Sequence, residues 1–240
     1  MFSINTHLNK IRNTQWVFLT WLLFVILALR VNNVASDGKC IKGKYHKASP
    51  GPELGKFGEC KVYEKNSCCT PEFTVELAAT RTEKLYNHTW DLCKNLSRAC
   101  ERFWIEQECF YQCDPYIYKY QHMSSAGAIH GVPICSSYCD SWFDACKNDQ
   151  ICVEDVLTGY EFNQHGINSC PVNSTCQTYA SMFKNGEGLC NKMWNTSYTY
   201  STDKSVCMEM TYKDPTASTT TNSASVIFLF GGLTFLLAML

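Results

Sequence analysis

Apolar residues and cysteines recur at helical spacing in two stretches of the chain. In residues 101–113, Ile105, Cys109 and Cys113 stand four positions apart, so they fall on one face of a helix. Residues 135–146 show a similar pattern, and Pro133 just ahead suits the entry of a helix. The residues that share the second face are Cys135, Cys139, Trp142 and Cys146. Both stretches are therefore predicted to be helices with one buried face.

A third helix is predicted over residues 91–100, with Leu92, Leu96 and either Ala99 or Cys100 facing inward. The rest of the central region lacks long periodic runs, and its glycines and prolines mark turns. Loops are expected at 47–52 and 185–188, and short strands near 61–63 and 208–210.

A strongly apolar run lies near the start of the chain. Residues 16–29 form a fourteen-residue apolar stretch that follows Lys10 and Arg12 and precedes small residues ending at Ser36. Crossing a bilayer takes about 20 apolar residues, so this run is too short for a membrane span. The pattern predicts a secretory signal peptide over residues 1–36, with cleavage near Ser36.

A second apolar run, residues 226–240, ends the sequence without a following charge. Small and polar residues precede it, and this combination is typical of a glycosylphosphatidylinositol (GPI) anchor signal. The alternative is a single membrane span, which the short run and the missing basic residues disfavour. Attachment is expected at Ala217 or Ser218, with Ser218 preferred, and the anchor signal is assigned to residues 218–240. The mature domain is then 37–217, held by its lipid on the extracellular face of the plasma membrane.

All sixteen cysteines lie between Cys40 and Cys207, at a density typical of disulfide scaffolds in secreted proteins. Zinc sites usually repeat C-x2-C pairs, and the sequence contains none, so disulfides are expected and a metal site is not. The cysteines run through the whole central region, which indicates one domain. Acceptor sequences for N-glycosylation agree with secretion, at Asn87, Asn95, Asn173 and Asn195.

Charge and motif content exclude two classes of function. The formal net charge is −1, and the central region is more acidic still, since Lys10, Arg12 and Arg30 precede it. Nucleic-acid binding is therefore not expected. No nucleophile, phosphate-loop or paired-carboxylate motif is present, so the chain is not expected to be an enzyme or to hold a cofactor. Its many aromatic residues suit a pocket for a flat ring instead.

The cysteine spacing and the residues between the cysteines resemble the family of folate receptors and riboflavin-binding proteins. The segments that carry the resemblance are HKASPGPE at 46–53, SCC at 67–69, ECFYQC at 108–113, VPIC at 132–135, YCDSWFDAC at 138–146 and LCNKMW at 189–194. The resemblance covers residues 40–215. It implies a compact α+β single domain, mostly helical with short strands, that is stabilised by eight disulfides and encloses one vitamin pocket. The bridges it implies are Cys40–Cys68, Cys60–Cys109, Cys69–Cys113, Cys93–Cys176, Cys100–Cys146, Cys135–Cys207, Cys139–Cys152 and Cys170–Cys190.

The resemblance disfavours folate bound in the manner of folate receptors. Those receptors have an Asp where Gln107 stands, and a Trp-Arg-x-x-Arg run in place of residues 124–128. They have a Trp-His pair where Val156 and Leu157 stand, and another Trp where Tyr160 stands. Losing the carboxylate and both guanidinium groups would leave polar edges of folate unpaired, at a cost of several kcal/mol.

The same resemblance favours a flavin. Riboflavin-binding proteins stack the flavin ring between a Tyr and a Trp, and Tyr111 and Trp194 occupy the matching positions. Ser197 matches a hydrogen-bonding position of folate receptors, and Gln107 can offer one donor and one acceptor to a ring edge. The further candidate ligand residues are Tyr86 and Tyr160.

The implied function is a cell-surface, GPI-anchored protein that binds a small-molecule vitamin, with riboflavin favoured, and that mediates its uptake by endocytosis. Folate stays the alternative, because a GPI tail is usual among folate receptors and Val156 replaces a Trp of the riboflavin branch. An adhesion receptor that has lost vitamin binding is an alternative of another class. Release in acidic endosomes is a further hypothesis, for which His88 and His130 are the candidate groups.

Overall fold

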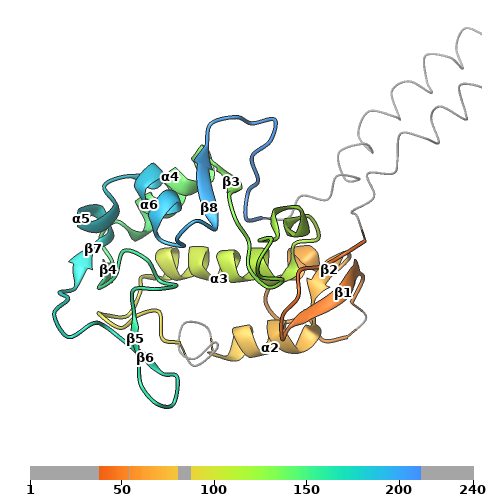
Figure 1. Cartoon of the computed structure of the whole chain (residues 1–240), viewed down its shortest axis with the longest axis horizontal. Coiled ribbons are helices and arrows are strands. Elements are labelled where there is room, and N and C mark those ends of the chain that lie inside the picture. Colours follow the sequence, from red (N-terminus) through yellow and green to blue (C-terminus); the bar gives the residue numbers. More distant parts are fainter. Residues whose placement is uncertain (1–37, 54, 81–87, 212–240) are drawn as a thin grey trace, which may run out of the picture. The chain divides into compact units, whose positions relative to one another are not determined.

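The structure is a computed structural model, in which residues 38–53, 55–80 and 88–211 are described (Figure 1). All of these residues belong to one compact unit, Ser36–Lys213. Within these ranges, no helix combines the length and the apolar character that crossing a membrane requires.

Several sequence predictions fall outside the described residues. These are the signal peptide 1–36, the anchor signal 218–240 with its attachment residue Ser218, the glycosylation site Asn87 and the candidate ligand residue Tyr86. They stay predictions, and the fold below concerns the central domain.

Helices and short strands alternate along the domain. In chain order they are β1 (His46–Gly51), the 3-10 helix η1 (Lys61–Tyr63), β2 (Ser67–Cys69), α2 (Pro71–Thr80), α3 (Arg98–Cys113), the 3-10 helix η2 (Ile117–Tyr120), β3 (Val132–Cys135), α4 (Ser136–Cys146), β4 (Gln150–Ile151), β5 (Glu161–Phe162), β6 (Asn168–Ser169), β7 (Gln177–Thr178), α5 (Tyr179–Phe183), α6 (Gly186–Lys192) and β8 (Tyr198–Ser201).

The longest helix, α3, begins after a capping serine and ends just before a proline. The hydroxyl of Ser97 accepts a hydrogen bond from the backbone N–H of Cys100 at 3.2 Å, which caps the first turn. Pro115 follows the helix, and the residue before a proline favours extended backbone, which Asp114 adopts. The helix predicted over 101–113 is thus confirmed, with a start three residues earlier.

The second predicted helix is also confirmed, as α4. Cys139, Trp142 and Cys146 are fully buried on one face, as their spacing predicts. Cys135 differs, because it ends strand β3 instead of opening the helix. β3 pairs in parallel with β8, so that Val132 lies opposite Tyr198.

Helix α3 crosses the middle of the domain. Figure 1 shows α4, α6 and β8 on one side of it and α2 on the other. The buried side chains of α3 include Trp104 and Ile105, both at 0% exposure, and they join one continuous core. The strand predicted near 208–210 is reduced to an isolated parallel bridge between Met208 and Ile134.

Eight disulfides join all sixteen cysteines, and with the helices and short strands they confirm the predicted fold class. The bridges are Cys40–Cys68, Cys60–Cys109, Cys69–Cys113, Cys93–Cys176, Cys100–Cys146, Cys135–Cys207, Cys139–Cys190 and Cys152–Cys170. Six of them match the predicted set.

The other two predicted bridges, Cys139–Cys152 and Cys170–Cys190, are wrong. Cys139 lies on α4 and Cys190 on α6, two helices that pack together and bring these Cα atoms to 5.9 Å. Cys152 and Cys170 then close a short loop of 18 residues' separation. The partner of Cys139 follows from helix packing, which sequence order does not encode.

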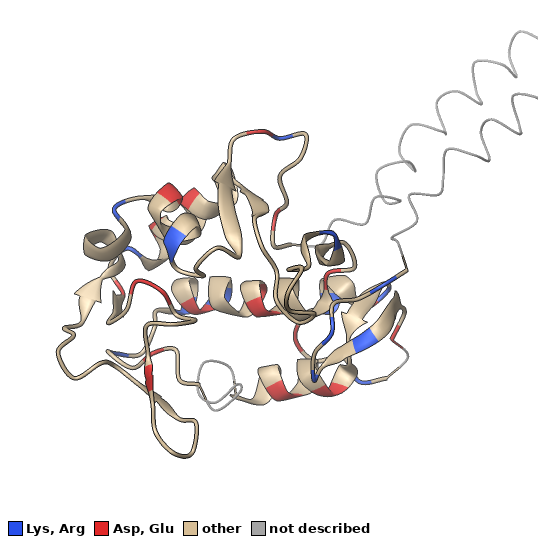
Figure 2. Ribbon diagram, in the orientation of Figure 1, with Lys and Arg blue, Asp and Glu red and all other residues tan. Residues whose placement is uncertain are grey.

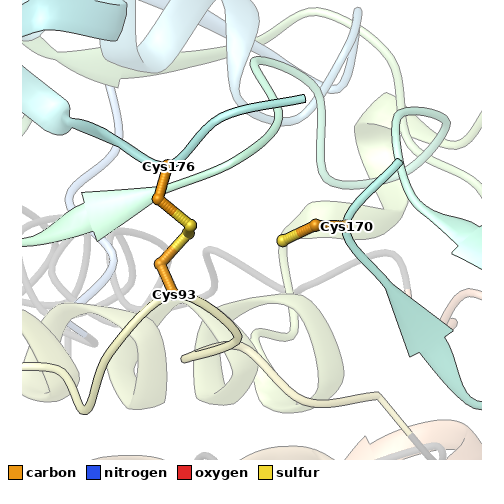
Figure 3. Close-up of side chains that lie close together, drawn as sticks. All are labelled: Cys93, Cys170 and Cys176. Carbon is orange, nitrogen blue, oxygen red and sulfur yellow. A yellow bond between two sulfur atoms is a disulfide. The ribbon is translucent and has the colours of Figure 1, made fainter. Parts of the chain in front are cut away.

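Two disulfides lie beside each other in the structure. The sulfurs of Cys93, Cys170 and Cys176 all lie within 4.8 Å of one another (Figure 3). A metal needs thiolates, whereas Cys93 is bonded to Cys176 and Cys170 is bonded to Cys152. The sulfur cluster is therefore a junction of two bridges.

The helix predicted over 91–100 is wrong. The backbone N–H and the hydroxyl of Ser97 both donate to the carboxylate of Asp149, at 2.6 and 2.8 Å, which holds the chain outside helical geometry. The Cys93–Cys176 bridge fixes the same segment further upstream. Only from Arg98 onward does the backbone become helical.

Three shorter predictions are also wrong. Residues 61–63 form a 3-10 turn instead of a strand, since the N–H of Tyr63 bonds the carbonyl of Cys60 at 2.9 Å. The predicted loop 47–52 is largely strand β1, because β2 provides an antiparallel partner. The predicted loop 185–188 opens α6, where the Asn185 side chain caps the N–H of Gly188 at 2.8 Å.

Candidate ligand-binding site

One face of α3 lines a cavity of about 290 Å³. The four side chains on this face follow the spacing i, i+3, i+4, i+7, which places them together on a helix. They are Trp104, Gln107, Glu108 and Tyr111. The face of α3 that carries Ile105, Cys109 and Cys113 lies nearly on the opposite side of the helix.

Distant parts of the chain complete the cavity. Residues 127–129 provide one wall, and the segments 156–160 and 194–198 provide others. The lining residues outside α3 are His88, Trp90, Gly127, Ala128, Ile129, Val156, Leu157, Tyr160, Trp194, Ser197 and Tyr198. The structure thus brings together five of the six candidate ligand residues, namely Gln107, Tyr111, Tyr160, Trp194 and Ser197.

Aromatic rings form a continuous wall of the cavity. Trp90 stacks on Trp104 with ring centroids 5.1 Å apart, and Trp104 meets Trp194 edge to face at 5.5 Å. Trp194 in turn meets Tyr198 at 6.3 Å. Trp104 is held by a hydrogen bond from its indole N–H to the hydroxyl of Tyr179, at 3.1 Å. Such a wall offers a flat ligand large apolar faces that are already in place.

Two buried polar atoms in the cavity have no hydrogen-bond partner among the described residues. They are Oε1 of Gln107 and the indole Nε1 of Trp194. The amide nitrogen of Gln107 donates to the hydroxyl of Tyr198 at 3.1 Å, which fixes the orientation of its carboxamide. Buried polar groups normally find partners, so an acceptor and a donor that lack them make Gln107 and Trp194 candidates to bond a ligand.

Tyr111 lies between the cavity and the segment that carries His46. Its hydroxyl donates to the carbonyl of Gly127 at 2.5 Å, and its ring meets the edge of His46 at 5.5 Å. Burial, with a smaller effect of the Glu108 charge, raises the pKa of Tyr111 to about 12. The ring therefore stays neutral at physiological pH, with its position fixed by the hydroxyl.

The described lining of the cavity is poor in positive charge. Neither Lys nor Arg is among its lining residues in the described part of the chain, and Glu108 lines it at 5% exposure. Burial lowers the pKa of His88, so its imidazole is neutral at pH 7. His130, the other candidate for acid release, is exposed and does not line the cavity.

Trp194 is buried and its neighbour Asn195 is exposed, and the Asn195 side-chain amide donates to the carboxylate of Asp155 at 2.9 Å. Trp194 is 7% exposed and lines the cavity, whereas Asn195 is exposed and adopts a positive φ of 52°. Ser197 is half-buried at the cavity wall. Asn95 and Asn173 are exposed as well.

Sequence reasoning missed four lining residues of chemical interest: Trp90, Trp104, Glu108 and Tyr198. Helical periodicity could have found two of them, because Trp104 and Glu108 share the α3 face of Gln107 and Tyr111. Nothing local in the sequence points to Trp90 or Tyr198, which reach the cavity through long-range packing.

Eight disulfides and one cavity walled by aromatic rings define a class of protein: a disulfide-rich α+β domain with an aromatic cavity. Residues 39–209 match the sequence profile of the folate receptor family. The chain therefore belongs to the folate receptor family, which confirms the resemblance found in its sequence.

Individual relatives fall into both branches of that family. The chain is 37% identical over 192 residues to the riboflavin-binding protein of Gallus gallus, covering 80% of this chain and 79% of the relative. It is 32% identical over 178 residues to folate receptor gamma of Homo sapiens, covering 71% and 72%. It is also 32% identical over 183 residues to folate receptor alpha of Bos taurus, covering 73% and 75%.

Proposed function

We propose that this chain is a vitamin-binding protein whose preferred ligand is riboflavin, held in the cavity beside α3. The observation that carries the proposal is an aromatic wall with one free acceptor, Gln107 Oε1, and one free donor, Trp194 Nε1. The pyrimidine N–H of a flavin can donate to Gln107 Oε1, and a ribityl hydroxyl outside the ring plane can accept from Trp194 Nε1. Tyr111 and Trp194 are the proposed stacking residues.

Charge supports riboflavin over folate. Folate carries the carboxylates of its glutamate, and the cavity lining described here contains Glu108 but no lysine or arginine. Burying an anion without a positive partner is costly, whereas riboflavin is uncharged. The relatives' names are those of a riboflavin-binding protein and of folate receptors, so both ligands are to be tested.

The test is a pair of calorimetric titrations of the disulfide-intact protein, one with riboflavin and one with folic acid. The proposal expects one molecule of riboflavin per chain and an affinity at least about tenfold above that for folic acid, because the latter leaves charges unpaired. Tighter binding of folic acid would overturn the assignment of riboflavin as the ligand. The proposal that the cavity beside α3 binds a vitamin would stand.

We propose further that the protein acts at the cell surface through a GPI anchor at Ser218 and delivers its ligand by endocytosis. The small and polar residues before the apolar run 226–240 support the anchor. A phospholipase specific for phosphatidylinositol should release the protein from expressing cells. Retention after that treatment would contradict the anchor.

The exposed sequons support N-glycosylation at Asn95, Asn173 and Asn195, with Asn87 as the fourth predicted site. Peptide N-glycosidase should lower the apparent mass of the protein from expressing cells. An unchanged mass would exclude these modifications.

Protein contact is a second candidate function, which exposed apolar side chains favour. Phe162 and Ile167 on and beside the β5–β6 hairpin are each 47% exposed, and Val172 is 86% exposed. A protein with all eight disulfides that binds neither riboflavin nor folic acid would favour this adhesion role.

A further inference from the structure

A second cavity lies on the N-terminal part of the domain and has a different chemical character. Lys39, Lys42, His46 and Lys47 line it, together with Tyr118 and other uncharged residues, and it measures about 650 Å³. No Asp or Glu is among its described lining residues. In a chain of net charge −1, this is a local concentration of positive charge.

The sequence concentrates the lysines. Lys39, Lys42, Lys44 and Lys47 fall within nine residues, and no acidic residue occurs between Gly38 and Pro52. Figure 2 shows blue basic segments on β1 and on the chain that leads into it. Lys44 is engaged elsewhere, because its Nζ donates to the Tyr45 hydroxyl at 2.9 Å. Short lysine-rich stretches of this kind are typical of surfaces that bind polyanions.

The backbone around this cavity is fixed. The N–H of Lys42 bonds the carbonyl of Ala126 at 2.8 Å, and Cys40 is bridged to Cys68. Gly127 permits this close approach, because a Cβ atom there would lie 2.7 Å from the Lys42 carbonyl oxygen. A preformed cavity loses little entropy when it binds a ligand.

The lysines differ in whether an acidic side chain already pairs with their positive charge. Lys47 pairs with Glu53, whereas the Lys39 ammonium lies 5.8 Å from the centroid of the Tyr118 ring. Lys42 is exposed and makes no ion pair with a described residue. Lys39 and Lys42 are therefore the groups available to an anion, and the half-buried Tyr118 ring lies beside Lys39 in the same lining.

We propose that this basic cavity binds a sulfated polysaccharide of the extracellular matrix or cell surface. Sulfate groups complement the ammonium groups, and sugar rings complement the aromatic platform. The eight disulfides place the domain in oxidising surroundings, where sulfated glycans are the common polyanions.

The basic cavity is separate from the proposed vitamin site. The two share no lining residue, and the Tyr111–Gly127 hydrogen bond stands between them with His46 against the Tyr111 ring. The proposal therefore does not rest on riboflavin binding, and variants in the basic cavity leave the vitamin cavity unchanged.

The test is a titration of the full chain with a heparin octasaccharide at 150 mM salt. Wild type should bind, and the double variant K39Q/K42Q should lose about tenfold or more in affinity, because it removes the two available ammonium groups and spares the Lys47–Glu53 pair. The matched control K94Q/K204Q removes two exposed lysines elsewhere, with the same change in net charge, and should retain wild-type affinity.

Three results would overturn the proposal. They are no binding of heparin by wild type, an equal loss in K94Q/K204Q, and equal affinity for desulfated heparin. Binding to vesicles that contain phosphatidylserine, in the absence of heparin binding, would assign the cavity to a membrane surface instead. Near-ultraviolet circular dichroism of both variants, expected to match wild type, shows that the fold is retained.

Discussion

Trp194 is the residue on which the proposed site depends most directly, and Trp142 provides its natural control. Both are buried tryptophans whose indole N–H has no described partner. Only Trp194 lines the aromatic cavity, whereas Trp142 packs in the core, 6.2 Å from the ring of Phe103.

We predict that Trp194→Phe weakens riboflavin binding about tenfold, because it removes a hydrogen-bond donor and part of a stacking surface, together about 1–2 kcal/mol. Trp142→Phe should lower the free energy of unfolding but leave the dissociation constant unchanged. The measurement is quenching of flavin fluorescence with each variant. Equal affinities for the two variants would show that the ligand does not contact Trp194.

His88 is the histidine among the described lining residues of the cavity, and it gains a positive charge in mild acid. Burial lowers its pKa, so it is neutral at pH 7 and gains a proton only below its ordinary range near pH 6.5. Protonation would then place a positive charge in a partly desolvated wall, next to an uncharged ring that cannot compensate it.

We predict that riboflavin affinity falls as the pH drops from 7 to about 5 and that His88→Gln flattens this dependence. His130→Gln is the control, since His130 is exposed and outside the cavity. Affinity that is flat in wild type, or a slope that His130→Gln removes, would contradict a role of His88.

Helix α6 packs so closely on α4 that there is no room for a side chain at Gly186. A Cβ atom at Gly186 would lie 2.3 Å from Oδ1 and 2.6 Å from the backbone nitrogen of Asp140 on α4, so only glycine allows this approach. α6 also leads directly into Trp194, which couples the packing of the helix to the cavity.

We predict that Gly186→Ala lowers the free energy of unfolding by about 1–3 kcal/mol, the usual cost of overpacking, and weakens riboflavin binding as well. Gly51→Ala is the matched control, because a Cβ there meets nothing within 4 Å. Urea unfolding of both variants checks the prediction. A loss in Gly51→Ala equal to that in Gly186→Ala would show that general glycine effects explain the result.

The bridge between α4 and α6 is a further prediction at this scale. Mass spectrometry of the unreduced, digested protein should find Cys139 linked to Cys190 and Cys152 linked to Cys170. Peptides linking Cys139 to Cys152 would support the pairing that the resemblance implies. No disulfide would then join α4 to α6.

Local signals predicted the elements whose pattern is long, and long-range contacts decided the rest. The cysteine periodicity found α3 and α4, because a buried face repeats over several turns. The apolar spacing that predicted a helix over 91–100 failed, because Ser97 there bonds the carboxylate of Asp149, which lies far along the chain. The short helix α6 was missed because its capping residue Asn185 and its first glycine also fit a loop.

At the scale of the whole molecule, the site is assembled from separate segments. α3 contributes one wall, 156–160 a second and 194–198 a third, and the parallel pair β3–β8 joins the last of these to the core. The resemblance supplied Gln107, Tyr111, Tyr160, Trp194 and Ser197 in advance. The packing that adds Trp90 and Tyr198 depends on tertiary contacts and became visible only in the fold.

The central claim is that the aromatic cavity beside α3 holds a flavin ring, and one titration tests it most directly. Riboflavin is titrated with disulfide-intact protein at pH 7.4 while flavin fluorescence is followed. The account predicts quenching that is complete at one chain per riboflavin, since a ring stacked against Tyr111 and Trp194 loses its emission. Undiminished fluorescence with protein that carries all eight disulfides would contradict it.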